Sequence, residues 1–184
     1  MPLVLVRHTR PAVDPTLCYG RWDLEPAESF PDDAAAVSGT LPTFTRVVTS
    51  PATRCRRLAD HLADGSDTGA PVVDERLSEM NFGRWEGRPW GELPRQELDT
   101  WAADFFNARP HGGETVAELF QRATQALRHW CLHSGDETVV VVTHLGVIRA
   151  ALAARDGDAG WQARVGFGGF VEAIPCNASN QGAG

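Results

Sequence analysis

Short runs of consecutive apolar residues alternate along this chain with longer stretches in which an apolar residue returns every three or four positions. Uninterrupted aliphatic and β-branched residues predict buried strands at 3–6, 46–50 and 138–144, since such runs suit a strand that is covered on both faces. Further strands are expected at 71–77 and within 163–174. The pattern therefore predicts strands separated by segments of helical or irregular character.

The helical periodicity falls between these strands. A helix is expected after the second strand, where apolar residues recur at the spacing i, i+3, i+4, i+7 from Cys55 onward. Other helices are expected at 92–106, 115–133 and 146–155, with a single helical turn within 32–37. The helix at 115–133 opens with a threonine followed three residues later by a glutamate, which is the pattern of a capping box.

The alternation of strands with helices indicates the fold class. It predicts an α/β fold, a three-layer αβα sandwich with a mostly parallel central sheet. No repeat or linker divides the chain, so residues 1–175 are expected to form a single domain, with 176–184 as a flexible tail of small and polar residues. Ligands of such sheets bind beyond the carboxyl ends of the strands, so functional residues are expected at that edge.

Composition and charge narrow the function classes. The 184 residues are 42% hydrophobic and 22% charged, as in ordinary globular proteins. The net charge of −7 argues against a nucleic-acid partner, which requires a basic face, but not against a small anion in a locally positive pocket. No apolar leader and no run of about 20 apolar residues is present, which predicts a cytoplasmic protein without a membrane partner. The cysteines form no C-x-x-C pair, so no zinc knuckle is expected.

Three of the predicted strands end in residues that bind or attack anions. The first runs into Arg7, His8 and Thr9, the second precedes Arg54 in the first turn of a helix, and the third ends at His144. If these strands are parallel neighbours, their ends meet at one edge, together with helix N-termini that favour anions. Each residue alone is more simply a solvated or internally bonded polar group. Together they predict a pocket for a phosphoryl group, whose oxygens match the planar guanidinium of arginine.

An acidic segment after the strand expected at 71–77 offers candidates for proton transfer. It contains Glu75, Glu79 and Glu86. Solvated loop charge is the simpler interpretation of each of them, and spacing alone leaves the choice among the three open.

Five segments carry a family resemblance, and they occur in one order along the chain: "LVRHT", "TSPATRCRRLA", "RLSEMNFGRWEG", "HGGETVAEL" and "VVVTHLGVIRA". Together they resemble the successive signatures of the histidine phosphatase superfamily, which has the phosphoglycerate-mutase-like fold. The resemblance runs from residue 3 to about 155. The segment "CYGRWDLEP", taken with "RHT", is similar to the α-ribazole phosphatase branch.

The resemblance implies roles for individual residues. It implies catalytic roles for His8, Glu79 and His144 and phosphate-binding roles for Arg7 and Arg54, with neither metal nor cofactor. Thr9 is a further phosphate-binding candidate, because its own hydroxyl could donate a hydrogen bond. His8 would be the nucleophile that forms a phosphohistidine, and Glu79 would be the proton donor, a choice that rests on the family and not on spacing. The strand end would hold His8 rigidly for in-line attack, while arginine stabilises charge on the equatorial oxygens.

Departures from the family pattern concern the substrate more than the chemistry. Thr9 stands where many members have glycine, Asp14 aligns where many have asparagine, and "LEPAESFPDDAAAV" replaces the usual Thr-x-x-Gly…Gln-Ala block. The resemblance also implies that residues 80–115 cap the site. Core packing is the expected role of the aromatic residues there, with stacking on a nucleoside-like or benzimidazole base as the alternative: Trp85, Trp90, Trp101, Phe105 and Phe106.

These patterns lead us to expect a phosphomonoesterase that hydrolyses a small phosphorylated metabolite through a phosphohistidine. The candidate substrate is α-ribazole 5′-phosphate, and a homodimer is one option for the assembly. A phosphoglycerate-mutase-type transfer is disfavoured by the short chain, and a non-catalytic phosphoryl-binding module by the presence of every expected histidine and arginine. A metallohydrolase with His8, His144 and Glu79 as ligands ranks last, because Arg7 and Arg54 would repel a divalent cation.

Overall fold

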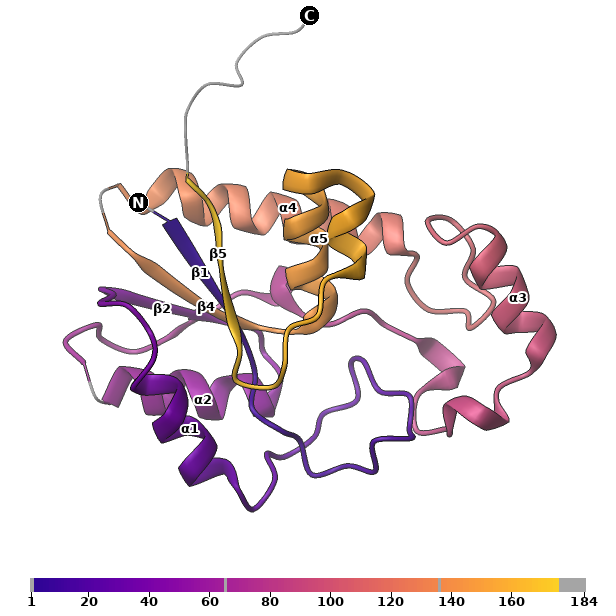
Figure 1. Ribbon diagram of the computed structural model, residues 1–184, viewed down its shortest axis with the longest axis horizontal. Coiled ribbons are helices and arrows are strands. Elements are labelled where there is room, and N and C mark those ends of the chain that lie inside the picture. The colour runs from indigo at the N-terminus through magenta and orange to yellow at the C-terminus, as the bar shows by residue number, and fades with distance from the viewer. Residues whose placement is uncertain (1, 65, 136, 176–184) are drawn as a thin grey trace, which may run out of the picture.

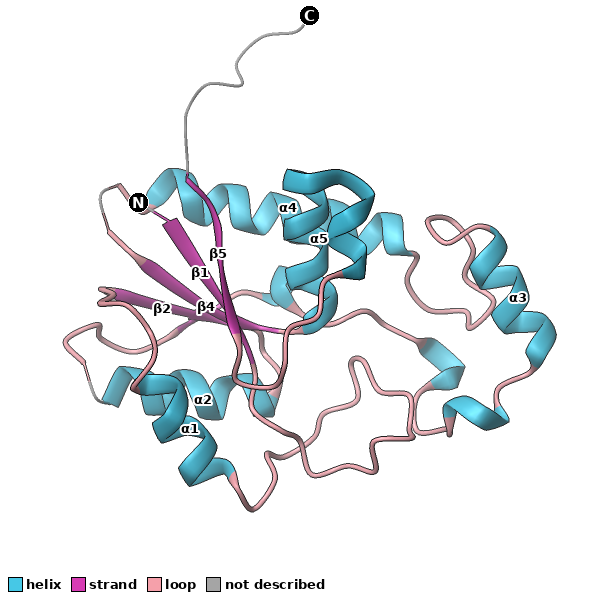
Figure 2. Cartoon of the chain, in the orientation of Figure 1, coloured by secondary structure: helices cyan, strands magenta, loops and turns pink. Residues whose placement is uncertain are grey.

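The computed structural model describes residues 2–64, 66–135 and 137–175, and their strands form one sheet between two layers of helices (Figure 1, Figure 2). The strands are β1 (Pro2–Arg7), β2 (Arg46–Thr49), β3 (Val72–Val73), β4 (Val139–Thr143) and β5 (Phe170–Pro175). Their order is β3-β2-β4-β1-β5, in which β5 alone runs antiparallel to its neighbour. This architecture confirms the predicted α/β sandwich with a mostly parallel sheet.

Alternate residues of the central strands enter two different cores. Leu3 and Leu5 of β1 pack with α4 (Val116–His133) and α5 (Leu145–Asp156) on one face. Val4 and Val6 of β1 pack with α1 (Phe30–Ser38) and α2 (Thr53–Asp64) on the other face. Figure 1 shows α1 and α2 on the side of the sheet opposite α4 and α5. Because successive strand side chains point to opposite faces, an uninterrupted apolar run satisfies both cores at once.

The helix α4 begins as its sequence predicts. The hydroxyl of Thr115 accepts the N–H of Glu118, and the Glu118 carboxylate accepts the N–H of Thr115, which completes the capping box. The buried face is formed by Val116, Leu119, Ala123, Ala126 and Leu127. Phe120 and Trp130 are only partly buried at its margin.

Two strands are shorter than predicted. The strand expected at 71–77 pairs only over β3, because the carboxylate of Asp74 accepts the N–H of Arg76 and starts the 3-10 turn Glu75–Leu77. The strand expected within 163–174 pairs only from Phe170 onward. Before it, Gly168 adopts a φ of 72°, a left-handed conformation that turns the chain sharply.

Helix boundaries also differ from the prediction. The single turn expected within 32–37 is the nine-residue helix α1. The helix expected at 92–106 is the shorter α3 (Arg95–Ala103). Pro94 disfavours helical geometry in the residue before it, so Leu93 is extended and α3 begins only after the proline.

The segment expected to cap the site has little regular structure besides α3. It contains the 3-10 turns Gly83–Trp85 and Trp90–Glu92, and α3 lies to one side of the sheet (Figure 2). A bridge between Leu17 and Pro89 ties it to the loop after β1. Among the described residues, no helix combines the length and apolar character required to cross a bilayer. The expected tail, 176–184, lies outside the described residues.

Candidate active site

The three parallel strand ends meet at one edge of the sheet. β4 lies between β1 and β2, and Arg7 of β1 is opposite Thr143 of β4. His8 follows β1 directly, His144 is the N-cap residue of α5, and Arg54 lies in the first turn of α2. The ring centroids of the two histidines are 5.2 Å apart, and Arg54 Nε is 3.3 Å from His8 Nε2. The structure thus brings these predicted residues together.

His8 is held as a neutral imidazole whose Nε2 is unprotonated. Its Nδ1 lies 2.7 Å from the main-chain oxygen of Thr9, which can only accept, so the proton is assigned to Nδ1. Nε2 accepts a hydrogen bond from Arg54 Nε and therefore carries the lone pair. Burial, reinforced by the charge of Arg54, lowers the pKa of His8 to about 3. A neutral imidazole of this kind can act as a nucleophile.

Arg54 is a fully buried guanidinium held by main-chain oxygens. Its Nη2 donates to the carbonyl of Gly20 at 2.7 Å, and its Nη1 donates to that of Trp22 at 2.9 Å. A further bond runs from Nη2 to His144 Nδ1 at 3.4 Å. Across the described ranges, no carboxylate forms an ion pair with Arg54. Its positive charge is therefore oriented by the protein without being neutralised by an acid.

His144 is a second buried neutral histidine. Burial is the main cause that holds its pKa well below the ordinary value, followed by the proximity of His8 and Arg54. Since Nδ1 accepts from Arg54, the ring proton is assigned to Nε2, which donates to Ser50 Oγ at 2.7 Å. Two neutral imidazoles thus flank one cation.

The carboxyl group of Glu79 lies against the N-terminus of α5. It accepts the N–H of Met80 at 2.9 Å and that of Gly146 at 3.2 Å. A Cβ at position 146 would overlap Glu79 Oε1, so a larger residue there would displace this carboxyl group. Glu79 lines the same cavity as Arg7 and His8.

The other two candidate acids are placed differently. Glu75 is exposed in its 3-10 turn. Glu86 accepts three main-chain N–H groups, those of Arg21, Trp22 and Phe82. Among the described residues that line the main cavity, Glu79 is the single carboxylate. Geometry therefore separates three glutamates that spacing could not.

Arg7 and Thr9 are both fixed by their surroundings. Arg7 Nη1 donates to the carbonyl of Val165 at 2.7 Å, and its Cζ lies 3.9 Å from the ring centroid of Phe167. Burial lowers the pKa of Arg7, although a guanidinium remains charged in proteins. Thr9 is fully buried and contributes its carbonyl to His8; its hydroxyl has no hydrogen-bond partner within the described residues.

The Asp14 carboxylate is directed into its own surface turn. It accepts both the N–H and the hydroxyl of Thr16, at 2.9 and 2.7 Å, and these bonds lower the pKa of Asp14. Asp14 does not belong to the described residues that line the cavity. The negative charge of Asp14, which could repel a phosphate, is thus directed away from the cavity.

A cavity of about 630 Å³ opens in front of His8, a size that suits a metabolite. Seven of its lining residues are aromatic: Tyr19, Phe82, Trp90, Trp101, Phe105, Trp161 and Phe167. Three of the five aromatic residues that could pack in the core or stack on a base, Trp90, Trp101 and Phe105, therefore border the cavity. The expectation of core packing holds for Trp85, which is fully buried and donates to Glu97.

Several cavity residues were missed by sequence analysis. Arg10 and Arg149 add positive charge to the lining, and Trp161 and Phe167 add aromatic surface. Arg149 interrupts the apolar run 145–154, and that interruption is a signal which could have identified it. Phe167 lies between glycines in a loop, where no periodicity marks its side chain.

The side chains considered as metal ligands do not form a metal site. Arg54 donates to both His8 and His144, so a cation already occupies the space between them. In the part of the chain that the structure describes, no group of three or more His, Cys, Asp or Glu side chains is arranged to hold a metal ion. The arrangement suits an anion instead.

The low pKa of His8 predicts acid-sensitive stability. An unfolded histidine titrates near 6.5, whereas folded His8 titrates at about 3, so the unfolded chain binds more protons between these values. The stabilisation from the neutral form is complete above pH 6.5 and is lost as pH falls toward 3. We expect the free energy of unfolding to fall by up to about 1.4 kcal/mol per pH unit for this group.

Urea unfolding of the wild type and of His8→Gln between pH 7 and 4 measures this dependence. The variant should show a shallower decline with acid, with His144 retaining its own contribution. Identical slopes for the two proteins would contradict the assigned protonation of His8.

The fold and the order of these residues belong to one protein class. The model of the histidine phosphatase superfamily (branch 1) matches residues 3–165, and the chain belongs to this superfamily. It is 29% identical over 113 residues to an adenosylcobalamin/α-ribazole phosphatase of Salmonella typhimurium, which covers 60% of this chain and 55% of that protein. The match therefore spans about half the length of the Salmonella protein.

Two further relatives carry other names. A glucosyl-3-phosphoglycerate phosphatase of Mycolicibacterium vanbaalenii is 26% identical over 170 residues, covering 83% of this chain and 72% of that protein. A phosphoglycerate mutase from Thermus thermophilus, whose crystal structure is known, is 27% identical in sequence to this chain. The two structures match with a TM-score of 0.74, and the match covers 94% of this chain and 92% of that chain. Family membership thus leaves the substrate to be argued from the cavity.

Proposed function

We propose that this protein is a phosphomonoesterase that works through a phosphohistidine at His8. The observation that carries the proposal is the neutral His8 ring, with its Nε2 lone pair beside Arg54 and a metabolite-sized cavity in front of it. A rigid nucleophile next to an oriented cation favours in-line attack on phosphorus, because little reorganisation is needed at the moment of reaction.

The reaction proceeds in two steps. His8 Nε2 forms a bond to phosphorus as the ester P–O bond breaks, and Glu79 gives its proton to the departing oxygen. Arg7 and Arg54 stabilise the charge on the equatorial phosphoryl oxygens. Water then attacks phosphorus as the bond from phosphorus to His8 Nε2 breaks, and Glu79, now a carboxylate, takes the proton of the water. This step releases inorganic phosphate and restores neutral His8 and protonated Glu79.

The aromatic walls support a substrate with a flat, uncharged body. Trp90, Trp101 and Phe105 come from the segment that we propose acts as a cap, and they can stack on a planar base. α-Ribazole 5′-phosphate joins such a base to a phosphorylated sugar, and the Salmonella relative is named for α-ribazole. It is the substrate that we propose.

One observation favours a second substrate class. Arg10 and Arg149 line the same cavity, and an additional arginine can bind a carboxylate in a bidentate manner. A phosphorylated carboxylic acid would use this charge, as the names of the Mycolicibacterium and Thermus relatives suggest for those proteins.

A panel of phosphomonoesters assayed in excess EDTA tests the function and the substrate class together. We expect hydrolysis that persists in EDTA, with kcat/KM for α-ribazole 5′-phosphate at least roughly tenfold above that for 3-phosphoglycerate or phosphoserine, the discrimination of one mismatched contact. Preference for the carboxylated esters would favour the second class. Mutase activity without net hydrolysis, or loss of activity restored by zinc or magnesium, would contradict the proposal.

A further inference from the structure

We propose that Glu86 is a positioning residue, which sets the orientation of Arg54 through the main chain of the loop 20–22. The inference rests on the proposed function, because it assumes that Arg54 binds the phosphoryl group. Glu86 itself touches no reacting atom.

The Glu86 carboxylate gathers three main-chain donors. Its Oε2 accepts the N–H of Trp22 at 2.6 Å, and its Oε1 accepts those of Arg21 at 3.1 Å and Phe82 at 2.9 Å. Charge-assisted bonds to a carboxylate are stronger than neutral ones. Glu86 therefore fixes the loop after β1 against the segment that follows Glu79.

The same loop holds Arg54 from its other side. The carbonyls of Gly20 and Trp22 accept the two Nη groups of Arg54 at 2.7 and 2.9 Å. Trp22 thus donates its N–H to Glu86 while its own carbonyl binds the guanidinium. Since Arg54 has no ion-pair partner among the described residues, these carbonyls determine the orientation of its guanidinium plane. Movement of the loop would turn the guanidinium away from His8.

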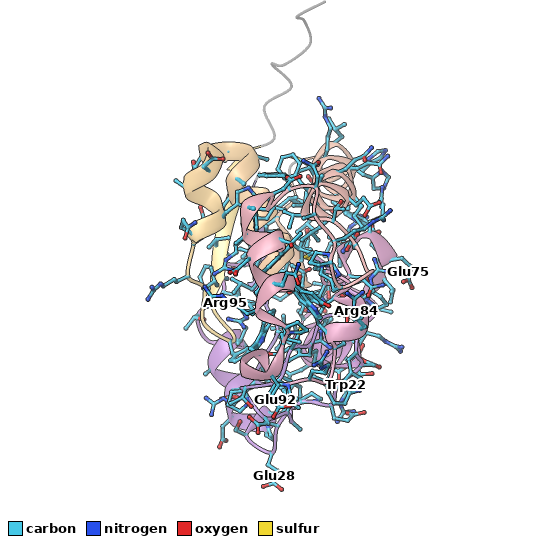
Figure 3. The ribbon with its side chains drawn as sticks, turned by 90° about the vertical axis from the view of Figure 1, so that its right-hand side faces the viewer. Trp22, Glu28, Glu75, Arg84, Glu92 and Arg95 are labelled. Atoms are coloured by element: carbon cyan, nitrogen blue, oxygen red, sulfur yellow. The ribbon has the colours of Figure 1, made fainter. Side chains whose placement is uncertain are left out.

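Close packing shows that the loop position is tightly specified. A Cβ at Gly20 would overlap the carbonyl oxygen of Met80 and press on the ring of Phe82. The side chain of Trp22 is not involved in this link. It is 43% exposed and lies on the face that Arg84 and Glu92 share in Figure 3. The contact with Arg54 is therefore made by the main chain.

An acid at this place orients Arg54 without neutralising it. A carboxylate in direct contact would form an ion pair and would repel the phosphoryl oxygens. Placed beyond one peptide unit, Glu86 fixes the carbonyls and leaves the guanidinium charge available to the anion. This geometry explains why neutral main-chain carbonyls, and not a carboxylate, orient the guanidinium of Arg54.

The test compares Glu86→Gln with a matched control. A neutral amide has one acceptor oxygen and cannot bind three N–H groups in the same way. We expect a roughly 10–100-fold loss in kcat/KM and in affinity for orthovanadate, the scale for a catalytic group misplaced by about 1 Å. The control is Glu97→Gln, which weakens a different carboxylate contact in the same segment, the one to Trp85. This control should change vanadate affinity less than threefold.

A double-mutant cycle identifies the residue through which Glu86 acts. In an Arg54→Lys background, which lacks the planar fork, Glu86→Gln should cost less than about twofold. A full additional loss there would overturn the proposal. A raised KM with unchanged vanadate affinity would also overturn it, and would assign the effect to Phe82 in the cavity wall.

Two further readouts separate this inference from the proposed function. Calorimetric titration with orthovanadate, and the ¹⁵N resonance of Arg54 Nε–H, report on the guanidinium even if no phosphomonoester is hydrolysed. Glu86→Asp, which keeps the charge, is the milder variant if Glu86→Gln does not fold, and it should lose vanadate affinity by a smaller factor. Wild-type vanadate affinity and an unshifted Arg54 signal in a folded Glu86 variant would refute the positioning role.

Discussion

Replacing His8 with alanine is expected to reduce phosphomonoesterase activity by roughly 10⁴-fold or more, because it removes the atom that forms the bond to phosphorus. The neighbouring imidazole of His144 is not free to replace it, since its Nδ1 accepts from Arg54 and its Nε2 contacts Ser50. Steady-state kcat and kcat/KM for p-nitrophenyl phosphate measure the loss.

Folding must be preserved for this comparison. Removal of a buried neutral ring is expected to leave the fold intact at neutral pH, which thermal unfolding checks. His129→Ala, at an exposed position on α4, is the matched control and should retain wild-type activity. If His8→Ala keeps more than about a tenth of the wild-type kcat, the nucleophile lies elsewhere.

Glu79→Gln is expected to slow phosphorylation of His8 by alkyl phosphates roughly 10²–10⁴-fold, the usual scale for general acid catalysis. Protonation helps most when the leaving group is a basic alkoxide. p-Nitrophenoxide departs without it, so the loss with p-nitrophenyl phosphate should be much smaller. Single-turnover kinetics on both substrates isolates this step from the later hydrolysis.

The matched control is Glu75→Gln, which changes the exposed carboxylate labelled in Figure 3 and should leave both rates unchanged. Equal slowing of both substrates by Glu79→Gln would show that Glu79 does not protonate the leaving group. Its hydrogen bonds from Met80 and Gly146 would then have only a structural role.

The alternation of strands and helices along the chain could be predicted, because the local sequence determines which element each segment forms. The run at 138–144 is apolar on both faces, and Thr115 with Glu118 marks the start of α4 at the correct residue. The antiparallel direction of β5 could not be predicted, since it depends on the turn at Gly168, whose N–H reaches the carbonyl of Arg7 far away in sequence.

The site was only partly accessible to sequence reasoning. The convergence of His8, Arg54 and His144 follows from strand adjacency, which a pattern of parallel strands implies. The distinction between Glu79 and Glu86 does not, because both are acids in one irregular segment. It depends on which carboxylate meets α5 and which meets the loop 20–22, contacts that only the folded chain defines.

The most direct measurement is rapid quenching of the reaction with ³²P-labelled substrate, followed by mapping of the labelled peptide. The account predicts an acid-labile, alkali-stable phosphate on His8 that appears within one turnover and decays at the rate of product release. Label at another residue would contradict it. Absence of any labelled residue, under conditions in which the Glu79→Gln variant still hydrolyses p-nitrophenyl phosphate, would also contradict the account. Water would then attack the substrate directly.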